Sequence, residues 1–405
     1  MQAVMVVPSG AENTLTQKIA GVPLLVRVIA TAMRAGVKEL LLFWPCDIDT
    51  RIWDQVESSP ALGGLHSHQI QLFPFDPRQN GSWAAMSTLL NDEFLWLPWN
   101  FVTSSRILAA IEPSPVLPLN WDKPIRLSKK LSACSLHFGV ASGPDVEGVF
   151  IRSRADIPRA ERFLVRHSGK PTDGIYSTIN RTLCRPIVRA LTHTGVTPNL
   201  VTLTGLVVAV ISALTYARGT YLAYVCGALL FFVSGLIDEM DGMLARLKFR
   251  ESAFGTWFEG FVDNATYLLL FSGITAGLHR QYGKNELIWG IALIAGCVLS
   301  VLVIAIQRQA LTSPDRPHEY AVRMNRLMET DSSVISRVAR QIHIFIKKGV
   351  AVHYVVIFTV LGGLTLFIRI AAISANLTWI VATYLAWRFA RHSRMASPEP
   401  LRSAT

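Results

Sequence analysis

The sequence has little charge for its length. Asp, Glu, Lys and Arg make up 17% of the 405 residues, whereas an average soluble protein contains about 25%. Hydrophobic residues make up 51%. The chain is therefore too apolar to be soluble throughout and too charged to lie wholly in a membrane. The same composition excludes intrinsic disorder and collagen-like repeats.

The sequence also lacks any Cys-x-x-Cys pair, which argues against a disulfide framework or a zinc site and suits a reducing compartment. The first ten residues have no basic segment followed by a long apolar core, so we expect no secretory signal there. The five cysteines are scattered: Cys46, Cys134, Cys184, Cys226 and Cys297.

The first 165 residues alternate predicted strands and helices. Leu24–Ala35 has helical spacing and ends at a glycine. This alternation predicts βαβ units and a largely parallel sheet. The predicted strands are Gln2–Val7, Glu39–Trp44, Gln69–Phe75 and Phe94–Trp99.

From about residue 198 the chain consists of long apolar segments, most of them without charge. Each is close to the ~20 residues that cross a bilayer as a helix. Six spans are predicted: Thr197–Ala217, Tyr221–Ile237, Thr256–Leu278, Leu287–Gln307, Gly349–Ile368 and Ile370–Trp387.

Lys and Arg gather on one side of these spans. If the N-terminal half is cytoplasmic, the opposite side holds only Arg218, Arg280, Lys284 and Arg369. We therefore expect a multi-pass protein of the cell inner or plasma membrane with both termini cytoplasmic. The net charge of +11 then reflects contact with anionic lipid rather than with nucleic acid.

Carboxylates occur where the second span ends and the third begins. Asp238 and Asp241 are three residues apart, and Glu259 and Asp263 are four apart. Each pair shares one helix face, and a short link lets the two helices return antiparallel. We expect the four carboxylates to converge at the cytoplasmic end of the bundle.

Four acids in a membrane site would repel one another unless a cation separated them. Oxygen ligands suit Mg²⁺ or Mn²⁺, and these ions often bridge carboxylates to phosphates. Gly242 and Gly255 would leave room for a ligand. The pattern indicates metal-assisted phosphoryl chemistry; the alternative is a helix end with solvated acids.

The spacing Asp-x-x-Asp-Gly-x-x-Ala-Arg, eight residues, then Gly-x-x-x-Asp-x-x-x-Asp resembles the signature of the CDP-alcohol phosphatidyltransferases. One position departs from it, because Glu259 stands where the family has Asp, which puts the metal preference and rate in question. The matching residues are Asp238, Asp241, Gly242, Ala245, Arg246, Gly255, Glu259 and Asp263.

This resemblance implies transfer of a substituted phosphate from a CDP-linked donor to an acceptor hydroxyl, with release of CMP. Asp238, Asp241 and Glu259 would hold two metal ions, and Asp263 would be both a ligand and the base. A homodimer is expected on the same ground. The residues expected to bind CDP are Pro198, Asn199, Thr202, Asp238, Asp241, Gly242, Ala245, Arg246 and Gly255.

The approach to the first span resembles one branch of the family, the di-myo-inositol phosphate phosphate synthases, in which a cytidylyltransferase domain precedes the membrane enzyme. The resemblance rests on Lys170–Gly174, Asn180-Arg181 and Thr197–Asn199. We also expect an interfacial helix here, with Arg185 and Arg189 at lipid headgroups. Arg308 is a candidate for binding an acceptor phosphate.

The N-terminal half resembles a nucleotidyltransferase that has lost its site. Its loop Pro8–Leu15 has no Arg and has Glu12 where a glycine would help. Asn100 stands where such enzymes have a metal-binding Asp, and a neutral amide holds Mg²⁺ poorly. We therefore expect a catalytically degenerate domain.

The sequence thus predicts a multi-domain chain. An N-terminal α/β, Rossmann-like nucleotidyltransferase-like domain precedes an all-α bundle of six transmembrane helices. The alternatives are a membrane-anchored cytidylyltransferase and a non-catalytic scaffold or transporter. Donor and acceptor stay open between CDP-diacylglycerol and CDP-inositol, and among alcohols and phosphorylated polyols. The expected segments are 1–165 (cytoplasmic), 166–197 (interfacial), 198–395 (phosphotransferase) and 396–405 (tail).

Overall fold

The computed structural model describes residues 1–63, 69–76, 80–111, 125–128, 146–169, 175–311 and 348–395. The chain divides into two compact units. Unit 1 comprises Met1–Asp173, Thr178–Leu200 and Glu239–Gly255. Unit 2 comprises Gly174–Ser177, Val201–Asp238 and Thr256–Thr405. The α/β part therefore groups with short stretches of the chain that flank the predicted spans.

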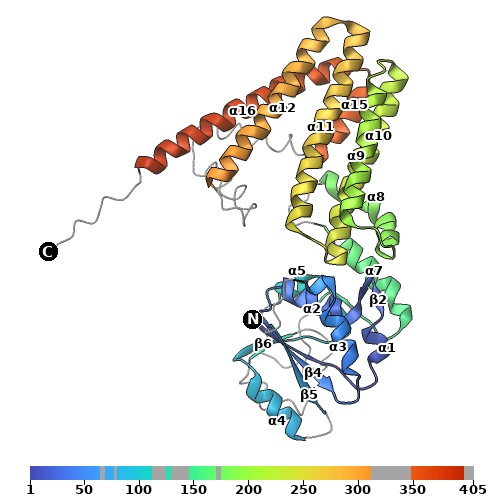
Figure 1. Ribbon diagram of the computed structural model, residues 1–405, viewed down its shortest axis with the longest axis vertical. Helices are drawn as coiled ribbons and strands as arrows, with labels where there is room; N and C mark the ends of the chain where they lie inside the picture. Colours follow the sequence, from blue (N-terminus) through green and yellow to red (C-terminus); the bar gives the residue numbers. More distant parts are fainter. Residues whose placement is uncertain are drawn as a thin grey trace, which may run out of the picture. The chain divides into compact units, whose positions relative to one another are not determined.

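Unit 1 is built on a five-stranded sheet in the order β5-β4-β1-β6-β8. The first four strands are parallel and β8 is antiparallel, which confirms the predicted α/β region with a largely parallel sheet (Figure 1). The strands are β1 (Gln2–Val6), β4 (Glu39–Pro45), β5 (Ile70–Phe75), β6 (Glu93–Trp96) and β8 (Ile125–Ser128).

The central strands form because their apolar runs are continuous and both faces are covered. Ala3, Val4 and Met5 are fully buried. Strand β6 ends at Trp96 rather than at the predicted Trp99, because Pro98 has no N–H to donate and a turn brings the Phe101 N–H to the Pro98 carbonyl at 3.2 Å.

Short helices surround this sheet. Helix α2 is almost wholly buried, and its bounds agree with the predicted helix to within one residue. The helices of this part are α1 (Glu12–Leu15), α2 (Leu24–Arg34), α3 (Thr50–Glu57), α4 (Asn80–Leu89) and α5 (Ser105–Ala109), with a 3-10 turn at Pro60–Leu62. Two small antiparallel pairs join β2 (Lys18–Ile19) to β3 (Val22–Pro23) and β7 (Phe101–Val102) to β9 (Val149–Phe150).

Unit 1 continues through two helices and the ends of two more. A 3-10 turn at Arg154–Asp156 leads into α7 (Ile157–Arg166), and α8 spans Ile175–Thr192. Helix α8 is amphipathic, and its exposed stripe is apolar: Ile179, Leu183 and Ile187 are each about half exposed. This stripe is the kind of face that lies in a membrane interface.

A buried arginine joins the α/β part to the end of α10 (Tyr221–Lys248). Arg27 is 2% exposed. Its guanidinium donates to the carbonyl oxygens of Ile19, at 2.8 and 3.0 Å, and of Leu247, at 2.8 Å. Burial lowers the pKa of Arg27 to about 9, against the opposing effect of Glu161, so the group is charged at neutral pH.

The chain beyond α10 is held by the same helix α2. Phe249 takes the left-handed conformation, with φ of 54°, and its ring lies 5.1 Å from the Arg27 guanidinium and 4.7 Å from that of Arg34. Arg34 also forms an ion pair with Glu251. Two arginines about two turns apart on α2 therefore hold the turn that leads from α10 into α11 (Ala253–Tyr282).

A second buried charge joins α7 to α8. Glu161 is 2% exposed and accepts hydrogen bonds from the Ala20 N–H, at 3.2 Å, and the Arg189 Nε, at 3.1 Å. The His193 Nε2 lies 3.1 Å from the same carboxylate. Lys248 adds a third link, because its Nζ donates to the carbonyl oxygens of Thr194 and Val196 just beyond α8. Arg189 thus pairs within the protein rather than with lipid headgroups.

The described residues of unit 2 are mostly helical, and five of the described helices are long and apolar enough to cross a membrane. They are Pro198–Tyr216, Tyr221–Lys248, Ala253–Tyr282, Lys284–Gln307 and Leu364–Tyr384. As secondary structure the helices are α9 (Pro198–Tyr216), α10, α11, α12 (Lys284–Leu311), α15 (Lys348–Val360) and α16 (Leu364–Met395). An integral membrane protein follows from this set.

The predicted fifth span is divided differently in the structure. In the described residues α15 has 13 residues and ends at Val360, inside the predicted span. Gly362, with φ of +71°, ends the helix before α16 begins. Arg369 lies inside α16 instead of between two spans, and it pairs with Glu286 of α12.

Close contacts between small residues hold the bundle together. A Cβ atom on Gly273 or Gly277 of α11 would overlap the backbone of α9 at Ala213 or Tyr216. Hydroxyl groups supply the hydrogen bonds: Ser212 donates to the Gly227 carbonyl at 2.7 Å. Such contacts are typical of membrane helices, and Figure 1 shows α9, α10 and α11 side by side.

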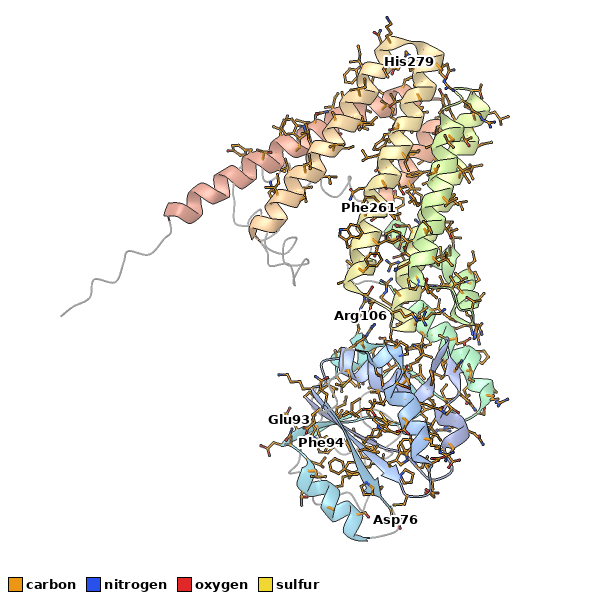
Figure 2. All side chains as sticks on the ribbon, viewed as in Figure 1. Asp76, Glu93, Phe94, Arg106, Phe261 and His279 are labelled. Carbon is orange, nitrogen blue, oxygen red and sulfur yellow. The ribbon has the colours of Figure 1, made fainter. Side chains whose placement is uncertain are left out.

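The outer faces of this bundle are apolar. Phe261, labelled on α11 in Figure 2, is 56% exposed. Leu222 and Leu214 are more exposed still. Helices α12 and α16 pair through polar groups, with Asn376 donating to the Ala292 carbonyl at 2.9 Å. Apolar surface outside and polar contacts inside suit a lipid environment.

We expect Arg27→Met to destabilise the full-length protein by about 3 kcal/mol, because the substitution leaves the buried carbonyl oxygens of Ile19, Ala20 and Leu247 without their charged donor. Thermal unfolding in detergent, followed by tryptophan fluorescence, measures this. Arg34→Met is the matched control on the same helix: its partly exposed ion pair with Glu251 should contribute less than about 1 kcal/mol. Equal losses in the two variants would contradict the special role of Arg27.

Candidate functional site

The first carboxylate pair lies on one unbroken helix. Asp238 and Asp241 are one turn apart on α10, and Gly242 and Ala245 follow on the same side of the helix. Asp241 is buried, at 3% exposure, and Asp238 is half-buried. A carboxylate so deeply buried needs a compensating charge or hydrogen bonds.

The second pair lies on α11. Glu259 and Asp263 are half-buried and one turn apart. The helix begins where it does because Ser252 caps it: its Oγ accepts a hydrogen bond from the Gly255 N–H at 3.0 Å. Ser252 was not among the residues expected from the sequence, although a serine three residues before a motif glycine is an N-cap signal.

The structure brings the starts of α9 and α11 together. A Cβ on Gly255 would lie 3.4 Å from the Asn199 Oδ1 and 3.0 Å from the Ser252 Oγ. Pro198 is the first residue of α9, a position that suits proline because its missing N–H is not needed there. Thr202 is buried one turn later. Asn199 and Gly255, both expected to bind CDP, are therefore neighbours.

Arg246 has a partner within the protein. Its Nε donates to the Ser168 carbonyl at 2.6 Å, and its guanidinium lies 3.3 Å from the position of a Cβ on Gly242. The arginine of the motif thus braces α10 against the end of α7. A direct role in binding CDP stays a prediction.

The donor chemistry of the motif fits Mg²⁺ or Mn²⁺, since Asp238, Asp241, Glu259 and Asp263 offer only carboxylate oxygens. In the part of the chain that the structure describes, however, no group of three or more His, Cys, Asp or Glu residues is close enough together to hold a metal ion. Convergence of all four carboxylates therefore stays a prediction.

Several predicted features fall outside the described residues. These are the Lys170–Gly174 segment, Cys134, the basic region between α12 and α15, and the 396–405 tail. Arg308 belongs to the last turns of α12, but its side chain is not among those described.

The position after β6 where the predicted degenerate domain lacks its metal-binding Asp makes a structural contact. The Asn100 Nδ2 donates to the Ile151 carbonyl at 3.1 Å, and the Asn100 carbonyl accepts from the Ile151 N–H at 2.9 Å. An ionised aspartate could not donate the first of these bonds. Asparagine at this position therefore serves the pairing of chain segments.

The helices that carry the motif lie in a segment that is similar to a known family. Residues 195–387 match the family model of the CDP-alcohol phosphatidyltransferases. This segment contains α9, α10 and α11 with the complete carboxylate motif. This match agrees with the family that the sequence resembles, and residues 195–387 are similar to the domain of that family.

Two curated relatives of this chain are named as synthases. The chain is 23% identical over 249 residues to the "Bifunctional IPC transferase and DIPP synthase" of Aquifex aeolicus, a match that covers 60% of this chain and 52% of the relative. It is 34% identical over 122 residues to the "Archaetidylinositol phosphate synthase" of Methanothermobacter thermautotrophicus, covering 29% of this chain and 58% of that protein. The chain thus spans about half the length of these relatives.

Among solved structures, the phosphatidylinositol phosphate synthase of Mycobacterium tuberculosis, with CDP-DAG bound, aligns with a TM-score of 0.37 and 18% identity. The alignment covers 57% of this chain and 98% of that one.

We expect Gly255→Val to weaken the binding of CDP by about tenfold or more, because the added side chain would crowd both Asn199 and Ser252. Equilibrium dialysis of the detergent-solubilised protein with radiolabelled CDP measures this. Gly195→Val is the matched control, since a Cβ on Gly195 meets no atom within 4 Å. Unchanged affinity in Gly255→Val would show that this junction does not contact the nucleotide.

Proposed function

We propose that the chain transfers a substituted phosphate from a CDP-linked donor to an acceptor hydroxyl and releases CMP. The observation that carries this proposal is the complete carboxylate motif on α10 and α11, within the segment that matches the family model. The matched relatives are longer than the stretch they share with this chain, so the activity of the whole protein belongs to the proposal.

The four acids of the motif would bind metal ions and accept a proton. Asp238, Asp241 and Glu259 would hold two divalent cations, with Asp263 as a further ligand. When bound, such ions neutralise the pyrophosphate and stabilise the leaving group. Asp263 would accept the proton from the acceptor hydroxyl. Each role depends on these carboxylates being ionised.

The starts of α9 and α11 would receive the nucleotide. Gly255 leaves space beside Asn199, and a side chain at either glycine of the motif would fill the approach to the backbone. Pro198 and Thr202, at the start of α9, would also contact the nucleotide. Arg246 would act by holding α10 in place, through its bond to the Ser168 carbonyl.

We propose an inositol phosphate as the acceptor. Two of the matched relatives bear names that specify inositol phosphate products, one archaeal and one from Mycolicibacterium smegmatis, the latter 27% identical over 169 residues. A CDP-activated diacylglycerol or related lipid would be the donor, with CDP-inositol as the alternative donor. Arg308 is the candidate for holding the acceptor phosphate.

The α/β part would serve as a structural domain without its own nucleotidyl transfer. The Asn100 contact with Ile151 and the absence of Arg from the Pro8–Leu15 loop support this. We propose the domain boundaries expected from the sequence: an α/β domain at 1–165, an interfacial segment at 166–197, a phosphotransferase domain at 198–395 and a tail at 396–405. We also propose six membrane spans, cytoplasmic termini and a homodimer.

We expect Asp263→Asn to lower the rate of CMP release by at least about a hundredfold, because the amide cannot take up the acceptor proton. The assay uses purified protein in detergent with Mg²⁺ or Mn²⁺, CDP-diacylglycerol or CDP-inositol, and inositol phosphate. Asp54→Asn, an exposed change on α3, is the control. Turnover that survives in Asp263→Asn, or that persists after EDTA treatment, would contradict the mechanism.

Glu259 provides a test of the metal role. We expect Glu259→Asp to keep metal-dependent activity with a changed ratio of rates in Mg²⁺ and Mn²⁺, because one methylene is removed and the charge is kept. Glu259→Gln should lose activity at every metal concentration. If Glu259→Gln matched the unmodified protein, Glu259 would not be a ligand.

A further inference from the structure

A cavity within unit 1 is lined by basic side chains from three elements. Its volume is about 390 Å³, within the range of ligand sites, roughly 300–1,000 Å³. Helix α5 contributes Arg106, and α8 contributes Arg181 and Arg185. Arg166 and His167 come from the end of α7. Figure 2 labels Arg106 at the surface of the α/β part.

Not all of this charge is neutralised by neighbouring acids. Glu239 pairs with Arg181 at 2.8 Å, and Glu147 lies 3.4 Å from the His167 Nε2. Among the described residues, no ion pair involves Arg106, Arg166 or Arg185. The buried Nε of Arg185 has no hydrogen-bond partner in the same part of the chain. A buried unused donor beside other cations is a site for an anion.

This cavity is separate from the carboxylate motif. Met243 of α10 lines it, and Met243 is two residues from Asp241. At about 100° per residue the two side chains leave α10 on opposite sides. The cavity therefore lies on the side of α10 that faces away from Asp241, and an anion bound there would not be a pyrophosphate held by Asp241.

The orientation of α8 favours a water-soluble ligand. Leu183 belongs to the exposed apolar stripe of this helix, and Arg181 and Arg185, each two residues away, leave on the opposite side. If the stripe lies in the membrane interface, the arginines face the α/β part. A lipid headgroup would approach from the other side of the helix.

We infer that this cavity binds a water-soluble phosphate monoester through Arg106 and Arg185. Guanidinium groups suit phosphate because their planar donors match its oxygens. The apolar atoms of Ile107, Val165 and Met243, which also line the cavity, would contact the organic part of the ligand. The ligand would link α5, α7 and α8 to the end of α10.

The test is isothermal titration of the full chain in phosphate-free detergent buffer. The probes are inorganic phosphate and glycerol 3-phosphate, with glycerol as the uncharged comparison. We expect saturable binding of glycerol 3-phosphate and none of glycerol. Arg185→Gln and Arg106→Gln, on different elements, should each weaken it by about tenfold or more, as expected for the loss of a charge-assisted bond. Two variants guard against misfolding of either one.

Arg159→Gln is the matched control, because Arg159 is exposed on α7 and does not line the cavity. Asp263→Asn should bind glycerol 3-phosphate as the unmodified protein does, which separates this site from the transferase site. Equal affinity in the cavity variants and in Arg159→Gln would overturn the inference. A second outcome would also overturn the inference. In it, phosphatidylglycerol in phosphatidylcholine nanodiscs protects the protein from thermal unfolding, whereas glycerol 3-phosphate has no effect.

Discussion

The arrangement of unit 1 depends on one buried guanidinium. Arg27 has five N–H donors and no acceptor, so its burial requires carbonyl oxygens on several sides. The chain supplies them from the turn after β2 and from the last turn of α10. The negative charge of Glu161 favours the charged form of Arg27 and so opposes the effect of burial. The α/β part and the end of α10 are therefore one packed body rather than two joined by a linker.

The bundle of unit 2 is held by different forces. Glycines let α9 and α11 approach until their backbones touch, and serine hydroxyls donate to carbonyl oxygens of neighbouring helices. Without water, these contacts replace the hydrophobic effect. Helix α10 takes part in both units, since its first residues pack in the bundle and its last turns pack against α7 and α8. The first two carboxylates of the motif, Asp238 and Asp241, lie where this helix passes from unit 2 to unit 1.

Much of this could be predicted from the sequence. Strands β1 and β4 were predictable because uninterrupted apolar runs leave no amphipathic helix face, and the motif positions followed from an uncharged span that ends in acids. The division of the fifth span was not, because hydropathy averages over Gly362 and does not register a helix stop. The hydrogen-bond partner of Arg246 and the basic cavity could not be predicted from the sequence either. Their elements, α5, α7 and α8, are separated in the chain, and only the folded structure brings them together.

The bond from Arg27 to Leu247 spans 220 residues, and this sets an order of assembly. A ribosome adds about 5–20 residues per second, so roughly 10–45 s pass between the synthesis of the guanidinium and that of its last acceptor. During that interval the N-terminal segment lacks the carbonyl that completes the burial of its charge. The final packing of the first domain to be made thus waits for the insertion of the second membrane helix.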